Sequence, residues 1–127
     1  MITADQVAVA VFADYIAQSD WMARCKTSET FPAFVHAFLY TLCFLVLTTH
    51  FDTLLVIGVT HFLIDRFRLA RYVVWLKNGL NPQFKLGPLT ATGYPDDAPV
   101  WLTVWLMIIT DNWMHIVINA LALHYLG

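Results

Sequence analysis

The chain has 127 residues, of which 59% are hydrophobic and only 13% charged, and its mean hydropathy is +0.63. Soluble domains carry about 25% charged residues, so this composition predicts a single integral membrane domain over residues 1–127. Seven Lys and Arg stand against nine Asp and Glu. This balance gives no basic surface for phosphate backbones and excludes nucleic acid as an expected partner.

Four apolar segments predict an all-α fold, a polytopic membrane protein built as a compact bundle of four transmembrane helices. We expect these helices at about 2–23, 31–49, 53–77 and 99–126. The second segment has no charged residue, and its Pro32 suits a first helical turn. Residues 81–99 hold four prolines and two glycines, which predicts a cytoplasmic loop over 81–97 that is long enough to act as a lid.

The positive charges predict the orientation of this bundle, because Lys and Arg are retained on the cytoplasmic side of a membrane. All of them fall between the first and second segments, or at the end of the third and in the loop that follows it: Arg24, Lys26, Arg66, Arg68, Arg71, Lys77 and Lys85. We therefore expect a multi-pass protein of the inner (cytoplasmic) membrane with both termini outside.

Each predicted helix also carries polar side chains where lipid disfavours them, namely Asp14, Gln18, His36, His61, Asp65, Asp111 and His115. An Asp at the centre of a span costs about 2.5–3.5 kcal/mol, so these groups need partners. At about 1.5 Å per residue, all of them fall about 12–22 Å from the outer helix ends, in one layer. Most are spaced i,i+4 and so share a helix face, and Tyr40 and Asn119 extend two of these faces.

Imidazoles and carboxylates from several helices are typical of a metal site in the core of a bundle. We expect the ligands of one or two divalent ions among Asp14, His36, His61, Asp65, Asp111 and His115. Zn, Mn or Fe would suit this mixture of nitrogen and oxygen ligands. Asp14, Asp65 and Asp111 are the candidate catalytic bases, and Gln18, Tyr40 and Asn119 are expected to support the ligands. The alternative is a structural hydrogen-bond network without metal.

Several short motifs together resemble a known family. They are residues 13–23 (ADYIAQSDWMA) with Lys26 following, His36, residues 60–65 (THFLID) and residues 111–115 (DNWMH). These motifs, which cover nearly the whole chain, resemble a small bacterial and phage membrane family catalogued as domain of unknown function 3307. That family is distantly similar to YdjM-type, LexA-regulated membrane-bound metal-dependent hydrolases. The resemblance implies hydrolase activity by analogy.

Our leading hypothesis is therefore a membrane-embedded metal-dependent hydrolase that contacts the lipid bilayer and acts on a lipid-linked substrate. A second hypothesis is a non-enzymatic membrane module that docks an envelope or phage partner. A third is a proton or ion path through the same Asp/His layer. Four helices, of which the first is short and polar, leave little surface to seal a polar layer from lipid, so we also expect a homo-oligomer, most simply a two-fold dimer.

Overall fold

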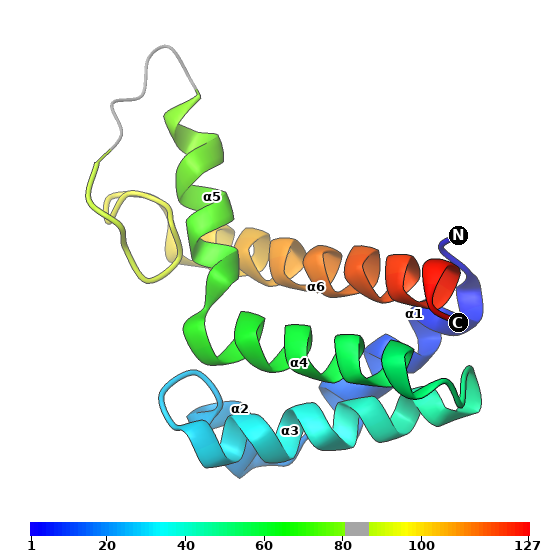
Figure 1. The fold of residues 1–127 in the computed structure, drawn as a ribbon. Helices are drawn as coiled ribbons and strands as arrows, with labels where there is room; N and C mark the ends of the chain where they lie inside the picture. The colour runs from blue at the N-terminus through cyan, green and yellow to red at the C-terminus, as the bar shows by residue number, and fades with distance from the viewer. Residues whose placement is uncertain (81–86) are drawn as a thin grey trace. The chain divides into compact units, whose positions relative to one another are not determined.

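The computed structural model describes residues 1–80 and 87–127, and the regular structure in these ranges is entirely helical (Figure 1). The chain forms two compact units. The first comprises Met1–Phe67 and His115–Gly127, and the second comprises Arg68–Met114. Of the loop predicted over 81–97, residues 81–86 lie outside the described residues, and residues 87–97 contain no helix.

The first unit begins with three short helical segments in place of the helix predicted over 2–23. They are α1 (Ala4–Val11), the π-helix η1 (Phe12–Ile16) and α2 (Asp20–Cys25). The side chain of Ser19 accepts a hydrogen bond from the backbone N–H of Met22 at 3.3 Å, and this N-cap starts α2 as a new helix. Residues 17–19 between η1 and α2 form no helix.

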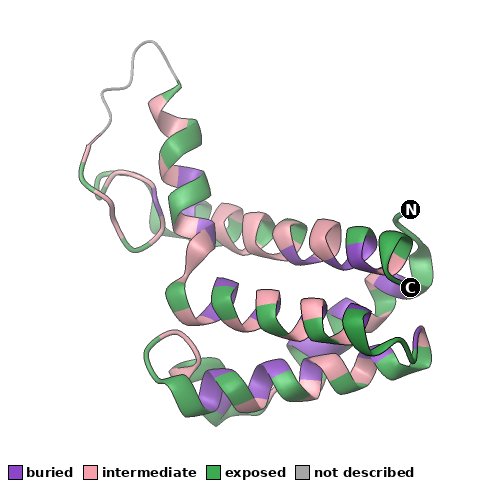
Figure 2. Ribbon diagram, viewed as in Figure 1, coloured by how far each residue is buried: buried purple, intermediate pink, exposed green. Residues whose placement is uncertain are grey.

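Helices α3 (Thr30–Cys43) and α4 (Phe51–Phe67) follow and pack against each other, with the short 3₁₀ segment η2 (Phe44–Val46) ending the first of them. Tyr40, Phe44 and Ile57 are fully buried where these helices meet. The buried faces of both helices point into the unit (Figure 2). The opposite face of α4 exposes an apolar residue at every fourth position: Phe51, Leu55, Val59, Leu63 and Phe67.

The helix predicted over 53–77 is divided at Arg68. This residue has φ 51° and ψ 50°, a left-handed conformation that ends α4, and α5 (Leu69–Gly79) begins immediately after it. Within the second unit, the loop after residue 86 packs on α5. Trp75 Nε1 donates to the carbonyl of Gly87 at 2.8 Å, and Asn78 Nδ2 donates to that of Gly93 at 3.2 Å.

The last helix, α6 (Val100–Tyr125), covers nearly the residues predicted for it and belongs in part to each unit. Among the described helices, α6 alone is long and apolar enough to cross a membrane, a test that core helices of soluble proteins also pass. At about 1.5 Å per residue, α3 is about 21 Å long and α4 about 26 Å, against about 30 Å of hydrocarbon. The predicted bundle of four transmembrane helices is therefore wrong. The orientation with both termini outside required an even number of spans and has no support.

Candidate metal centre

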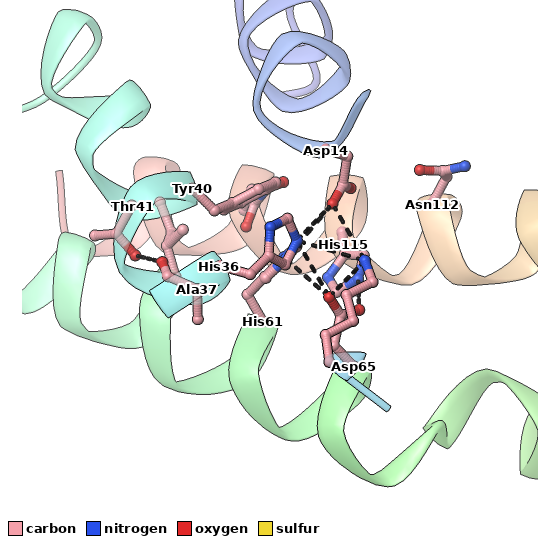
Figure 3. A network of polar contacts seen from close by, with 12 residues as sticks. Asp14, His36, Ala37, Tyr40, Thr41, His61, Asp65, Asn112 and His115 are labelled. Carbon is pink, nitrogen blue, oxygen red and sulfur yellow. Dashed lines mark hydrogen bonds and ion pairs between the residues drawn. The ribbon is translucent and has the colours of Figure 1, made fainter. Parts of the chain in front are cut away.

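Two aspartates and two histidines from three different segments meet inside the first unit. Asp14 lies in the π-helix, His36 on α3, and His61 and Asp65 one turn apart on α4. One ligand atom from each of the four lies within 4.8 Å of the others, and all four residues are buried. Figure 3 shows their side chains converging. The π-helix places Asp14 toward the cluster, in agreement with the frequent occurrence of such turns at functional sites.

The distances between these atoms are those of a coordination shell. His36 Nε2 lies 3.2 Å from Asp14 Oδ1 and 3.3 Å from Asp65 Oδ2. His61 Nε2 lies 3.5 and 3.3 Å from the same two oxygens, and 2.9 Å from His36 Nε2. A tetrahedral ion bound at about 2.0–2.1 Å holds its ligand atoms about 3.3–3.4 Å apart. Four edges of the tetrahedron defined by these atoms, at 3.2–3.5 Å, thus have lengths that fit one divalent ion, whereas the 2.9 Å between the two imidazole nitrogens is shorter and is a hydrogen-bond distance.

Hydrogen bonding alone accounts poorly for this arrangement. A neutral imidazole has at most one hydrogen on Nε2, and that hydrogen can point to one acceptor. His36 Nε2 nevertheless has two carboxylate oxygens and another imidazole nitrogen within 3.3 Å. Within the described part of the chain, buried Asp65 Oδ2 accepts no hydrogen bond of good geometry. A cation at the centre would satisfy all of these atoms at once, so the residues present fit a bound metal ion.

Lys26 also reaches this cluster, from the turn that follows α2. Its Nζ lies 2.8 Å from Asp65 Oδ2, 3.4 Å from His36 Nε2 and 4.0 Å from Asp14 Oδ1. From the sequence, Lys26 was expected only to contribute to membrane orientation and to a family motif. Two buried aspartates within one layer were the signal that could have identified it, because buried carboxylates need a positive partner.

His115 contacts the other oxygen of Asp65. Its Nε2 lies 3.3 Å from Asp65 Oδ1, and its ring centroid lies 4.1 Å from that of His61. His115 is therefore placed to orient the Asp65 carboxylate. Asp111 lies one turn earlier on α6, is half-buried and belongs to the second unit, so its predicted role as a ligand and base stays a prediction.

Tyr40 and Asn119, two of the predicted supporting residues, form a second layer. Asn119 Nδ2 donates to the Tyr40 hydroxyl at 2.7 Å, and both side chains are buried. The Tyr40 ring stacks on that of His61, with centroids 3.7 Å apart and planes 19° apart. His61 Nδ1 has no hydrogen-bond partner among the described residues. Ring packing by Tyr40 and His115 therefore fixes the orientation of His61.

Gln18 is not placed as the sequence analysis expected. The i,i+4 spacing from Asp14 requires a continuous helix, whereas the π-helix ends at Ile16 and Gln18 follows it in the break before α2. Its Oε1 is buried without a hydrogen-bond partner in the described residues. The predicted supporting role of Gln18 stays a prediction.

The charges of the cluster are tightly linked. Burial alone would raise the pKa of Asp65, but nearby His61 and contacts from His115 and His36 hold it well below its ordinary value of 3.8. Burial alone would raise the pKa of Asp14 as well, but the contact with His36 and the charges of His61 and Lys26 together lower it. Burial lowers the pKa of His61, whereas His36 has a raised pKa because its contacts with Asp14 and Asp65 outweigh burial. Both carboxylates are therefore ionised at neutral pH, as metal ligands must be.

Fold and site together define an all-helical protein with buried Asp/His groups close enough to hold a metal ion. The sequence profile of the family "Protein of unknown function (DUF3307)" matches residues 4–86, about two thirds of the chain. The chain belongs to this family. The match contains Asp14, Lys26, His36, His61 and Asp65, and ends before residues 111–115. The chain matches none of the curated proteins and none of the solved structures with which it was compared.

Proposed function

We propose that this protein is a metal-dependent hydrolase whose centre is formed by Asp14, His36, His61 and Asp65. The observation that carries the proposal is the set of five distances between 2.9 and 3.5 Å that join these ligand atoms. Hydrogen bonds among these four side chains do not by themselves explain why two imidazole nitrogens and two carboxylate oxygens meet at one point. A shared divalent ion does, since it attracts all of them.

Within the set, His36, His61 and Asp65 suit the role of ligands and Asp14 that of general base. Catalytic metal sites use about three protein ligands and leave one position open. Asp14 is the carboxylate to spare, because its side chain is 8% exposed against 2% for Asp65 and because it comes from a separate π-helical turn. In this role Asp14 Oδ1 accepts a proton from the attacking water, and His115 holds Asp65 in its coordinating orientation.

Zn, Mn and Fe all accept imidazole and carboxylate ligands, and three such ligands with one open position are typical of catalytic Zn. When bound, such an ion would lower the pKa of a water molecule enough to supply hydroxide near neutral pH. The distant similarity of the family to YdjM-type hydrolases is itself part of the proposal, and it implies this class of reaction by analogy.

We further infer that the lipid bilayer is a partner and that the substrate is lipid-linked. Two features support this: the length and hydropathy of α6, and the apolar residues exposed along one face of α4. Exposed apolar surfaces of this extent mark sites that contact membranes or proteins. The inner membrane as the location and a two-fold dimer as the assembly remain part of the proposal.

Metal analysis of the purified protein tests the proposed function. We expect about one equivalent of a divalent metal in the wild type, and its loss in His61→Ala and Asp65→Asn. His50→Ala is the matched control, because His50 is exposed at the opposite end of α4, and it should retain the metal. Metal-dependent cleavage of p-nitrophenyl acetate or p-nitrophenyl phosphate would support hydrolysis. Wild-type protein that takes up no metal on dialysis against Zn, Mn or Fe would refute the proposal.

A further inference from the structure

The ammonium group of Lys26 occupies the side of the metal centre formed by Asp14, His36 and Asp65. We propose that the Lys26 ammonium group competes with the metal ion for this centre. It neutralises the carboxylates when metal is absent and must move to solvent when metal binds. This inference rests on the proposed metal centre. It adds a residue that determines how tightly, and with what structural change, the centre is loaded.

The contact distances of Lys26 show why it and a metal ion exclude each other. Lys26 Nζ lies 2.8, 3.4 and 4.0 Å from three of the four tetrahedral atoms. A metal ion would bind two of those atoms, Asp65 Oδ2 and His36 Nε2, at about 2.0–2.2 Å. An ammonium group and a divalent ion would then share their closest neighbours with no ligand between them, and two cations at such a separation repel strongly in a buried site. The two positions are therefore mutually exclusive.

The charge balance of the centre also changes with its metal content. Without metal, the centre holds two buried carboxylates, and burying an uncompensated charge is strongly destabilising. The ion pair between Lys26 and Asp65 supplies the compensation. With a divalent ion bound, the same carboxylates are already neutralised, and the ammonium group adds an excess positive charge. The preferred position of Lys26 thus changes with the metal content of the site.

The side chain of Lys26 can also reach solvent. It lies in the turn at residues 26–28 and not within a helix, and its side chain is 17% exposed, against 1–8% for the side chains it contacts. Lysine has a flexible four-carbon stem with a strongly hydrated end group. Rotation about its side-chain bonds therefore moves the ammonium group to solvent without unfolding any helix.

Measured metal affinity separates this proposal from the proposed function itself. In Lys26→Met, the competitor is removed while most of the stem is kept, and we expect Zn to bind at least about tenfold more tightly than in the wild type. Lys77→Met is the matched control, because Lys77 is an exposed lysine of α5 in the second unit, and it should leave the affinity unchanged. Affinities would come from competition with a chelator of known strength.

A second measurement uses the wild type alone, in case Lys26→Met folds poorly. Amine-directed labelling followed by mass spectrometry should modify Lys26 slowly in metal-free protein and at least about fivefold faster after Zn is added, with Lys77 as the internal reference. Tighter binding by Lys26→Met, or faster labelling with Zn, supports the competition. Equal affinity together with unchanged labelling, in a protein that does bind Zn, overturns it and leaves the metal centre standing. If neither protein binds metal, both proposals fail and Lys26 is a permanent counter-ion.

Discussion

Helices α3 and α4 lie close together at Gly58, and Gly58→Ala tests how this contact holds the two halves of the metal centre in place. A Cβ atom at Gly58 would lie 2.6 Å from Thr41 Oγ1. The hydroxyl does not yield easily, because it donates to the carbonyl of Ala37 at 2.8 Å. Overpacking of this kind costs about 1–3 kcal/mol. Replacing a helical Gly by Ala returns about 1 kcal/mol, so the net loss in the free energy of unfolding should be about 0–2 kcal/mol.

The sign should change when Thr41 is shortened. In a Thr41→Ala background the clashing oxygen is gone and the nearest remaining atom, the Cβ of residue 41, is 3.7 Å away, an ordinary contact distance. Gly58→Ala should then stabilise the protein by up to about 1 kcal/mol. Urea unfolding of the wild type, both single variants and the double variant gives the coupling energy, for which we expect about 1–3 kcal/mol. The same effect of Gly58→Ala in both backgrounds would refute the close approach of the helices.

Three further predictions concern the centre itself. Asp14→Asn should retain at least half of the wild-type metal while losing the metal-dependent hydrolysis of a test ester; loss of the metal as well would make Asp14 a ligand. His115→Ala should weaken metal binding by about 10- to 100-fold without abolishing it, as measured by chelator competition, because His115 only orients Asp65. An unchanged affinity would remove His115 from the site. The pKa of the Asp65 carboxyl is lower in the folded protein than its ordinary value of 3.8, so the ionised carboxylate stabilises the fold at pH values above 3.8. This contribution is lost as the pH falls below 3.8 toward the lowered pKa. Metal-free wild type should therefore lose more stability between pH 5 and about pH 2.5 than metal-free Asp65→Asn, and equal losses would contradict the low pKa.

The sequence predicted the candidate site better than it predicted the fold around it. His61 and Asp65 lie four residues apart within an uninterrupted helix, so their shared face followed directly from helical periodicity. His36 could be assigned to the same site from its predicted distance to the outer helix end, because α3 and α4 are joined by a short turn and run side by side. Asp14 and Gln18 have the same spacing, but the π-helix and the Ser19 cap separate them. Periodicity alone gives no sign of where a helix changes its hydrogen-bonding pattern.

The four-span prediction failed for a different physical reason. Composition reports how many apolar residues a chain has, whereas spanning depends on the length of each unbroken helix. The Arg68 conformation and the Ser19 cap shorten two predicted spans, and α3 gives way to a 3₁₀ turn after Cys43. Lys26 was overlooked for a related reason. Its charge was assigned to the membrane surface, although two buried aspartates were equally in need of it.

The positions of the site residues along the chain indicate which residues hold the cation and which orient its ligands. Every atom of the proposed tetrahedron, and Lys26 beside it, comes from residues 14–65, within the segment matched by the family profile. His115 and Asn119 come from beyond that segment: His115 contacts Asp65 and the ring of His61, and Asn119 contacts Tyr40. The first group therefore determines whether a cation is held, whereas the second determines how rigidly its ligands are aimed. Changes in the second group should weaken metal binding by degrees, whereas changes in His36, His61 or Asp65 should abolish it.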